Sequence, residues 1–156
     1  MSYIEEIKKE LNQAAQVLND FISKEANLDA IEDAADLMVA SYADKGKIIS
    51  CGNGGSNCDA THFAEELTGR FREDRDPLAA IAINDPGFIT CTANDFGFDR
   101  IFSRYVRALG QKGDVLLAIS TSGTSKNVVA AAEIAKQKGL KVIGLTGKNN
   151  GELAEY

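Results

Sequence analysis

Apolar residues recur at helical spacing over the first 45 residues of the chain. Ser2 followed by Glu5 forms a capping-box pattern, so a long amphipathic helix is predicted from the start of the chain. Asn27 is a suitable N-cap for a second helix, which we expect to end near Gly46. The apolar positions that define the first helix are Ile4, Ile7, Leu11, Ala14, Val17, Leu18, Phe21 and Ile22.

From Lys47 onward, short apolar runs alternate with helical patterns. Buried strands separated by helices are typical of a parallel sheet covered on both faces. We therefore predict one α/β domain over 1–156, with two helices in 1–45 and a doubly wound parallel sheet with flanking helices in 46–156. The expected strands are 47–51, 78–83, 114–119 and 141–145, and the expected helices after the first strand run through Arg70 and over 87–93, 100–109 and 126–138.

The first candidate site is the glycine turn after the first strand, Gly52-Asn53-Gly54-Gly55-Ser56. In doubly wound sheets ligands bind beyond the carboxyl ends of the strands, and glycines let backbone N–H groups approach a ligand. The same glycines would also make an ordinary tight turn, so the residue types leave both interpretations open. The dinucleotide fingerprint GxGxxG is excluded, because Asn57 stands where its last glycine would be.

The second candidate is the hydroxyl loop, Ser120-Thr121-Ser122-Gly123-Thr124-Ser125, between a predicted strand and a predicted helix. Hydroxyls and free backbone N–H groups at a helix N-terminus attract anions. The loop contains no Lys or Arg, so the expected ligand is a phosphate monoester held by neutral donors and the helix dipole. A helix cap with additional serines is the alternative, and the spacing excludes a Walker A loop.

The third candidate is the pair His62 and Glu66. Four residues apart, the two side chains share one face of a helix and could hold a metal together, or place a carboxylate beside an imidazole. A carboxylate partly removed from water there could serve as a general base. A solvated His/Glu pair on the surface is the alternative.

Two polar segments are weaker candidates. The segment Asn94 to Phe98 is expected to be a loop between helical segments, and a turn with an N-capping Asp explains it slightly better than a ligand site. The charge run Arg70 to Asp76 is expected to be a solvated connection whose arginines are available to a partner subunit or an anionic substrate.

Composition removes several function classes. A net charge of −6 with no basic stripe excludes nucleic acid as an expected partner. The chain also contains no run of 18 apolar residues, which a membrane span would require. Three cysteines without a Cys-x-x-Cys pair are neither a disulfide framework nor a zinc module, so we expect a cytoplasmic protein. Because His62 is the single histidine, this chain alone cannot complete a mechanism that needs two imidazoles.

Four segments resemble the phosphoheptose isomerase family of sugar isomerase (SIS) domain enzymes, and the similarity runs over essentially the whole chain. The Ser-Thr-Ser-Gly loop indicates the wider SIS superfamily, and the block that begins at His62 indicates this family in addition. The segments are Ser50-Cys-Gly-Asn-Gly-Gly-Ser56, His62-Phe-Ala-Glu-Glu-Leu-Thr-Gly-Arg70, Asn94-Asp-Phe-Gly-Phe98 and Gly113-Asp-Val-Leu-Leu-Ala-Ile-Ser-Thr-Ser-Gly123.

The resemblance implies an aldose-ketose isomerase with a flavodoxin-like fold. It would convert sedoheptulose 7-phosphate to D-glycero-D-manno-heptose 7-phosphate by enediol proton transfer, on the route through ADP-heptose to lipopolysaccharide. It further implies a homotetramer with sites between subunits and one zinc per subunit, ligated by His62 and Glu66, with Glu66 also the catalytic base. The substrate-binding residues implied by the motifs are Asn53, Gly54, Gly55, Glu66, Asn94, Asp95, Ser120, Thr121, Ser122 and Ser125.

The family continues beyond the length of this chain with a strand and a helix that supply the remaining zinc ligands, a Gln and a His. We therefore expect a 156-residue polypeptide to be inactive or nearly so as an isomerase, and its strand at 141–145 to be a sheet edge. Asn57 stands where the family often has His. The alternative function is a non-catalytic SIS adaptor or sugar-phosphate sensor, of the type that associates with the bacterial replication initiator. A third is an SIS isomerase or etherase that acts on an amino-sugar phosphate.

Overall fold

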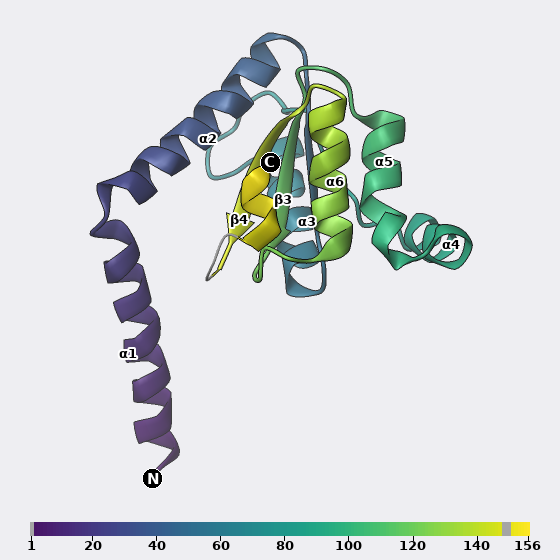
Figure 1. The fold of residues 1–156 in the computed structure, drawn as a ribbon. Coiled ribbons are helices and arrows are strands. Elements are labelled where there is room, and N and C mark those ends of the chain that lie inside the picture. Colours follow the sequence, from purple (N-terminus) through teal and green to yellow (C-terminus); the bar gives the residue numbers. More distant parts are fainter. Residues whose placement is uncertain (1, 148–150) are drawn as a thin grey trace. The chain divides into compact units, whose positions relative to one another are not determined.

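A four-stranded parallel sheet forms the centre of the fold in the computed structural model, which describes residues 2–147 and 151–156 (Figure 1). The strand order β2-β1-β3-β4 is the flavodoxin-like order, so the predicted fold class is confirmed. All the predicted strands are present, with β2 shorter than expected and β4 at the edge, where Leu145 is 55% exposed. The strands are β1 (Ile48–Gly52), β2 (Ala80–Ala82), β3 (Val115–Ser120) and β4 (Lys141–Thr146).

Helices cover both faces of this sheet. Alternate side chains of β1 and β3 point to opposite faces, as the pleat of a strand requires. On one face Ile49 and Leu116 pack with α5 and α6, and on the other Ile48 and Val115 pack with α3. The helices after β1 are α3 (Gly55–Thr68), α4 (Pro86–Phe96), α5 (Ile101–Leu109) and α6 (Lys126–Gln137), with 3-10 segments η1 (Phe98–Arg100) and η2 (Gly151–Glu155). Among the described residues, no helix is long and apolar enough to span a bilayer.

The chain divides into two compact units, Met1–Asp36 and Leu37–Tyr156. In the first unit, α1 (Tyr3–Ile22) begins as predicted, because the Ser2 hydroxyl accepts a hydrogen bond from the Glu5 backbone N–H at 3.3 Å. Its apolar stripe is exposed to solvent in the single chain: Leu11 is 66% exposed. A stripe of this length without cover is typical of a helix that packs against another protein surface.

The second helix, α2 (Glu25–Ala43), corrects one prediction. Asn27 is not its N-cap, because the helix begins two residues earlier, directly after a two-residue turn. The Asn27 side chain instead donates to the Phe21 carbonyl at 2.8 Å and so satisfies an acceptor in the last turn of α1. The helix ends at Ala43, before Lys45 takes a positive φ of 61°.

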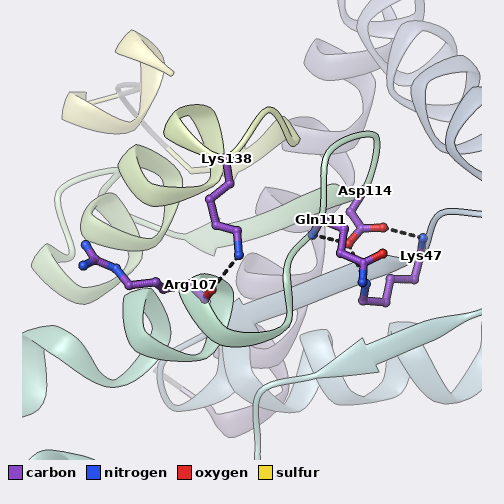
Figure 2. Close-up of polar contacts among 5 residues, drawn as sticks. All are labelled: Lys47, Arg107, Gln111, Asp114 and Lys138. Carbon is purple, nitrogen blue, oxygen red and sulfur yellow. Dashed lines mark hydrogen bonds and ion pairs between the residues drawn. The ribbon is translucent and has the colours of Figure 1, made fainter.

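A buried carboxylate joins the amino ends of β1 and β3 (Figure 2). Asp114, which is 1% exposed, accepts hydrogen bonds from the Lys47 backbone N–H at 3.0 Å, the Lys47 ammonium at 2.6 Å and the Gln111 N–H at 2.8 Å. In the same view the Lys138 ammonium donates to the Arg107 carbonyl at 2.5 Å, which links the last turns of α5 and α6. The buried Asp114 carboxylate therefore has both a counter-charge and hydrogen-bond donors at this end of the sheet.

Candidate functional site

Both candidate loops lie where the order of the strands reverses. From the central strand β1 the chain runs to β2 on one side, then returns across the sheet to β3 on the other. Connections that leave neighbouring strands in opposite directions open a crevice at the carboxyl ends of those strands. The glycine turn follows β1 and the hydroxyl loop follows β3, so the structure places the two loops at this switch point, as the sequence predicts.

The three glycines at 52, 54 and 55 have different physical roles. A Cβ on Gly52 would lie 2.7 Å from Ser56, so this residue permits the close approach of strand and helix. Gly54 has a positive φ of 55°, which favours glycine. A Cβ on Gly55 would meet no atom within 4 Å. The turn is thus both structural and open at its tip, where Gly54 and Gly55 are exposed at the N-terminus of α3.

The hydroxyl loop is held in shape by bonds within itself. Ser120 donates to the Ser125 hydroxyl at 2.9 Å, and the Ser122 hydroxyl accepts from the Thr124 N–H at 3.2 Å and from the Thr124 hydroxyl at 3.0 Å. Gly123 closes the turn with a φ of 68°. Ser125 occupies the N-cap position of α6 without a side-chain cap bond. The loop therefore presents preformed neutral donors at a helix N-terminus, an arrangement that suits a phosphate group.

His62 and Glu66 meet on the outer face of α3. His62 Nε2 lies 3.1 Å from Glu66 Oε1, as the four-residue spacing predicts. The His62 side chain is 71% exposed and that of Glu66 is 31% exposed, while Ala60 and Ala64 form the buried face of the same helix. A hollow of about 440 Å³ borders the pair and is lined also by Phe63. A carboxylate and an imidazole in contact can exchange a proton or bind one cation together.

The segment 70–76 after α3 is exposed throughout, as expected for a solvated connection, and one of its arginines also contacts the end of the helix. Arg75 donates to the Glu66 carbonyl at 2.7 Å and to the Leu67 carbonyl at 3.0 Å. These are carbonyls in the last turn of α3, which lack partners within the helix. Its guanidinium thus stabilises the helix that carries the His62/Glu66 pair. Arg70 is likewise exposed and lies 3.9 Å from Asp74.

Asn94 and Asp95 correct a second prediction. They lie in the last turn of α4 and not in a loop, and Gly97 ends that helix with a φ of 87°. The aspartate that caps a helix here is Asp85, whose carboxylate accepts from the Phe88 N–H. Asn94 donates to Asp95 at 2.8 Å, and both side chains are exposed. Among the described residues, no hydrogen bond or ion pair joins them to either loop at the switch point.

One residue at the site was not found from the sequence. Asn127, in the first turn of α6, exchanges two hydrogen bonds with Asn53 of the glycine turn, at 2.9 and 2.8 Å. It is 2% exposed. Asn127 is the second residue of α6, after the N-cap Ser125 and Lys126, and its partner is 74 residues away, so no local signal indicated this contact.

Cys51, directly before the glycine turn, is an inert core residue. It is fully buried on β1, and burial raises the pKa of its thiol to about 12. A thiolate at neutral pH is therefore excluded at this position.

The donor chemistry of the His62/Glu66 pair suits zinc, which binds imidazole nitrogen and carboxylate oxygen. The pair supplies two ligands of the usual four. Within 2–147 and 151–156, no cluster of three or more His, Cys, Asp or Glu side chains could hold a metal ion. The residues present thus fit part of a zinc site.

Comparison with known proteins gives a consistent family assignment. Residues 3–147 match the model of the SIS domain family. The chain is 59% identical to the phosphoheptose isomerase of Edwardsiella ictaluri over 152 residues, which are 97% of this chain and 79% of that protein. It is 60% identical to that of Histophilus somni, over 97% of this chain and 78% of the relative.

A solved structure supports the same assignment. The phosphoheptose isomerase of Neisseria gonorrhoeae superimposes with a TM-score of 0.92 at 39% identity, covering 99% of this chain and 80% of the other. The sheet, the flanking helices and the N-terminal helices are therefore shared with that structure.

Proposed function

Since the chain belongs to the phosphoheptose isomerase family of SIS-domain proteins, we propose that the two loops at its switch point bind sedoheptulose 7-phosphate and that Glu66 transfers the proton. The chain is an aldose-ketose isomerase of heptose biosynthesis. The observation that carries the proposed site is the preformed hydroxyl loop at the N-terminus of α6, beside the open tip of the glycine turn.

The hydroxyl loop would hold the phosphate. Ser120, Thr121, Ser122 and Ser125 surround the first turn of α6, where the helix dipole favours an anion. A phosphate fixed there is remote from the reacting carbons, so its binding energy serves to position them. Asn53, Gly54 and Gly55 would contact the sugar from the adjacent strand end.

Glu66 would act as the base for both proton transfers. Moving the carbonyl from C2 to C1 requires removal of a proton from C1, which gives a cis-enediol, and return of a proton to C2. One carboxylate can perform both steps, and the partial burial of Glu66 beside His62 supports this role. His62 and Glu66 would hold the zinc, which when bound supplies a Lewis acid for the developing oxyanion.

We place the complete site between copies of this chain in a homotetramer. The switch-point loops, the outer face of α3 and the end of α4 carry separate groups of the proposed site residues, and no bond given for the described residues connects these groups. Exposed apolar residues along α1, such as Leu11, supply a surface for assembly. A monomeric mass at micromolar concentration, measured by analytical ultracentrifugation, would refute the shared site.

Isomerisation by wild-type protein and by Glu66→Gln tests the base. Turnover of sedoheptulose 7-phosphate is followed with added zinc at high protein concentration, so that a slow isomerase is detected. We expect Glu66→Gln to lower turnover by about 10²- to 10⁴-fold, the usual effect of removing a general base. Measurable turnover by wild type that Glu66→Gln retains in full would contradict the assignment.

Glu65→Gln is the matched control, because Glu65 is the adjacent, exposed carboxylate of the same helix. It should retain wild-type turnover. Zinc affinity, measured by competition with a chromophoric chelator, supplies a readout independent of turnover: His62→Ala and Glu66→Gln should weaken it and Glu65→Gln should not.

A non-catalytic adaptor or sugar-phosphate sensor is the alternative function. It requires the hydroxyl loop but no base, so it predicts binding of the sugar phosphate without interconversion and without an effect of Glu66→Gln on any property except zinc affinity. The contact between Glu66 and His62 favours the enzyme, since a sensor has no use for this pair.

A further inference from the structure

The Asn53/Asn127 pair spans the switch point. Asn53 Nδ2 donates to Asn127 Oδ1 at 2.9 Å, and Asn127 Nδ2 donates back to Asn53 Oδ1 at 2.8 Å. Asn53 belongs to the turn after β1, and Asn127 follows the hydroxyl loop in α6 (Lys126–Gln137). The two side chains thus bridge the carboxyl ends of β1 and β3, one from each loop.

The bond does not serve the helix that carries Asn127. Side chains near a helix N-terminus commonly cap the free N–H groups of their own helix. The Asn127 amide instead reaches across to the glycine turn, and it is 2% exposed. A buried amide that turns away from its own helix requires its partner, because without Asn53 it would be left unsatisfied.

The pair also limits what Asn53 can offer a ligand. A side-chain amide has two N–H donors and two acceptor sites, and the reciprocal pair uses one of each. Asn53 is half-buried and keeps its remaining donor and acceptor in an orientation that Asn127 sets. The orientation of this amide is therefore coupled to the position of the loop proposed to hold the phosphate.

We propose that Asn127 is a positioning residue that fixes the glycine turn relative to the hydroxyl loop, so that a sugar phosphate can contact both at once. This inference rests on the proposed function of the two loops. Inorganic phosphate needs the hydroxyl loop alone, whereas sedoheptulose 7-phosphate must reach both walls of the crevice. A residue that sets the distance between the two loops therefore affects the affinity for sedoheptulose 7-phosphate more than the affinity for inorganic phosphate.

Binding of the two probes to the full chain tests this proposal. Dissociation constants for inorganic phosphate and for sedoheptulose 7-phosphate are measured by titration calorimetry on wild type, Asn127→Ala, Asn53→Ala and the double variant. We expect Asn127→Ala to weaken the binding of sedoheptulose 7-phosphate by about tenfold, the equivalent of one buried hydrogen bond. The binding of inorganic phosphate should weaken by less than about twofold. Since the two side chains act as one unit, the double variant should bind no more weakly than the weaker single variant.

Gln137→Ala is the matched control. Its side-chain amide is on the same helix and donates to Glu133 at 3.1 Å on the exposed surface, so neither affinity should change. Asn127→Ser, which keeps a small polar side chain at this position, serves the test if Asn127→Ala does not fold, which circular dichroism would show. Equal weakening of both probes, or additive losses in the double variant, would overturn the positioning role alone. Failure of wild type to bind sedoheptulose 7-phosphate would overturn the proposed function, and this inference with it.

Discussion

The amino and carboxyl ends of the central strands β1 and β3 carry different kinds of polar residues. At the amino ends, Asp114 is buried and accepts three hydrogen bonds, two of them from Lys47 (Figure 2). The charge of this carboxylate is therefore satisfied within the protein. At the carboxyl ends, the polar groups are neutral hydroxyls and amides, held in place by one another. The first arrangement stabilises the fold, and the second keeps donors ordered without a charge that a ligand would have to displace.

This difference separates stability from binding. A buried carboxylate with a lysine partner leaves no capacity for a ligand, whereas the hydroxyl loop keeps the N-terminus of α6 accessible. Substitutions at the two ends should therefore have distinct signatures, large in unfolding free energy at one end and large in affinity at the other.

Asp114→Ala should have the largest effect on stability. It leaves the Lys47 ammonium, which is 21% exposed, and two backbone N–H groups without their acceptor. We expect a loss of about 3 kcal/mol in the free energy of unfolding, measured by urea denaturation, with affinity for sedoheptulose 7-phosphate within about twofold of wild type. Lys47→Met should cost less, because Asp114 keeps both N–H donors. A loss below about 1 kcal/mol for Asp114→Ala would show that this end of the sheet does not depend on the ion pair.

Ser122→Ala should have the reverse signature. The Ser122 hydroxyl is exposed and orders the loop through Thr124, so its removal should weaken inorganic phosphate by about tenfold, about 1.4 kcal/mol, with unfolding changed by less than about 0.5 kcal/mol. Ser2→Ala is the control, since that hydroxyl caps the start of α1 and should cost stability but no phosphate affinity. If both variants bound phosphate as wild type does, the hydroxyl loop would not be the phosphate site.

Cys51 is the last buried core residue of β1 before the glycine turn of the proposed site. Its pKa of about 12 lies above the ordinary thiol value of 9.0, so the buried neutral thiol contributes stability that is complete below about pH 9 and is lost as pH rises toward 12. The unfolding free energy of wild type should fall more steeply above pH 9 than that of Cys51→Ala.

Thiol labelling followed by mass spectrometry checks the same boundary at pH 8. The exposed Cys58 and Cys91 should react, and Cys51 should react only after unfolding. Rapid labelling of Cys51 in the folded protein would place solvent deeper under the glycine turn than the structure does.

The sequence predicted those features that depend on neighbouring residues. Strands, helices, the His62/Glu66 contact and the position of both loops follow from periodicity, i,i+4 spacing and the geometry of parallel sheets. Asn27 was misassigned because a two-residue turn lets α2 begin before the best capping residue. The prediction placed Asn94 and Asp95 in a loop because a glycine such as Gly97 is compatible with either a loop or the end of a helix. In the structure Gly97 ends α4.

Contacts between distant segments could not be predicted in this way. The Asn53/Asn127 pair and the position of Arg75 at the end of α3 depend on how the sheet brings segments together. Either residue type is as common in an ordinary surface position, so only the assembled fold distinguishes them.

The Lys47/Asp114 ion pair has a consequence for synthesis of the chain. The two residues are 67 positions apart, and β1 pairs with β3 through this separation. At roughly 5–20 residues per second on the ribosome, Asp114 follows Lys47 after about 3 to 13 seconds. Among the segments made before β3, α3 and the short β2 make most of the contacts with β1. Early packing of Ala60 and Ala64 of α3 against β1 would therefore shield its apolar side chains from other nascent chains until β3 arrives.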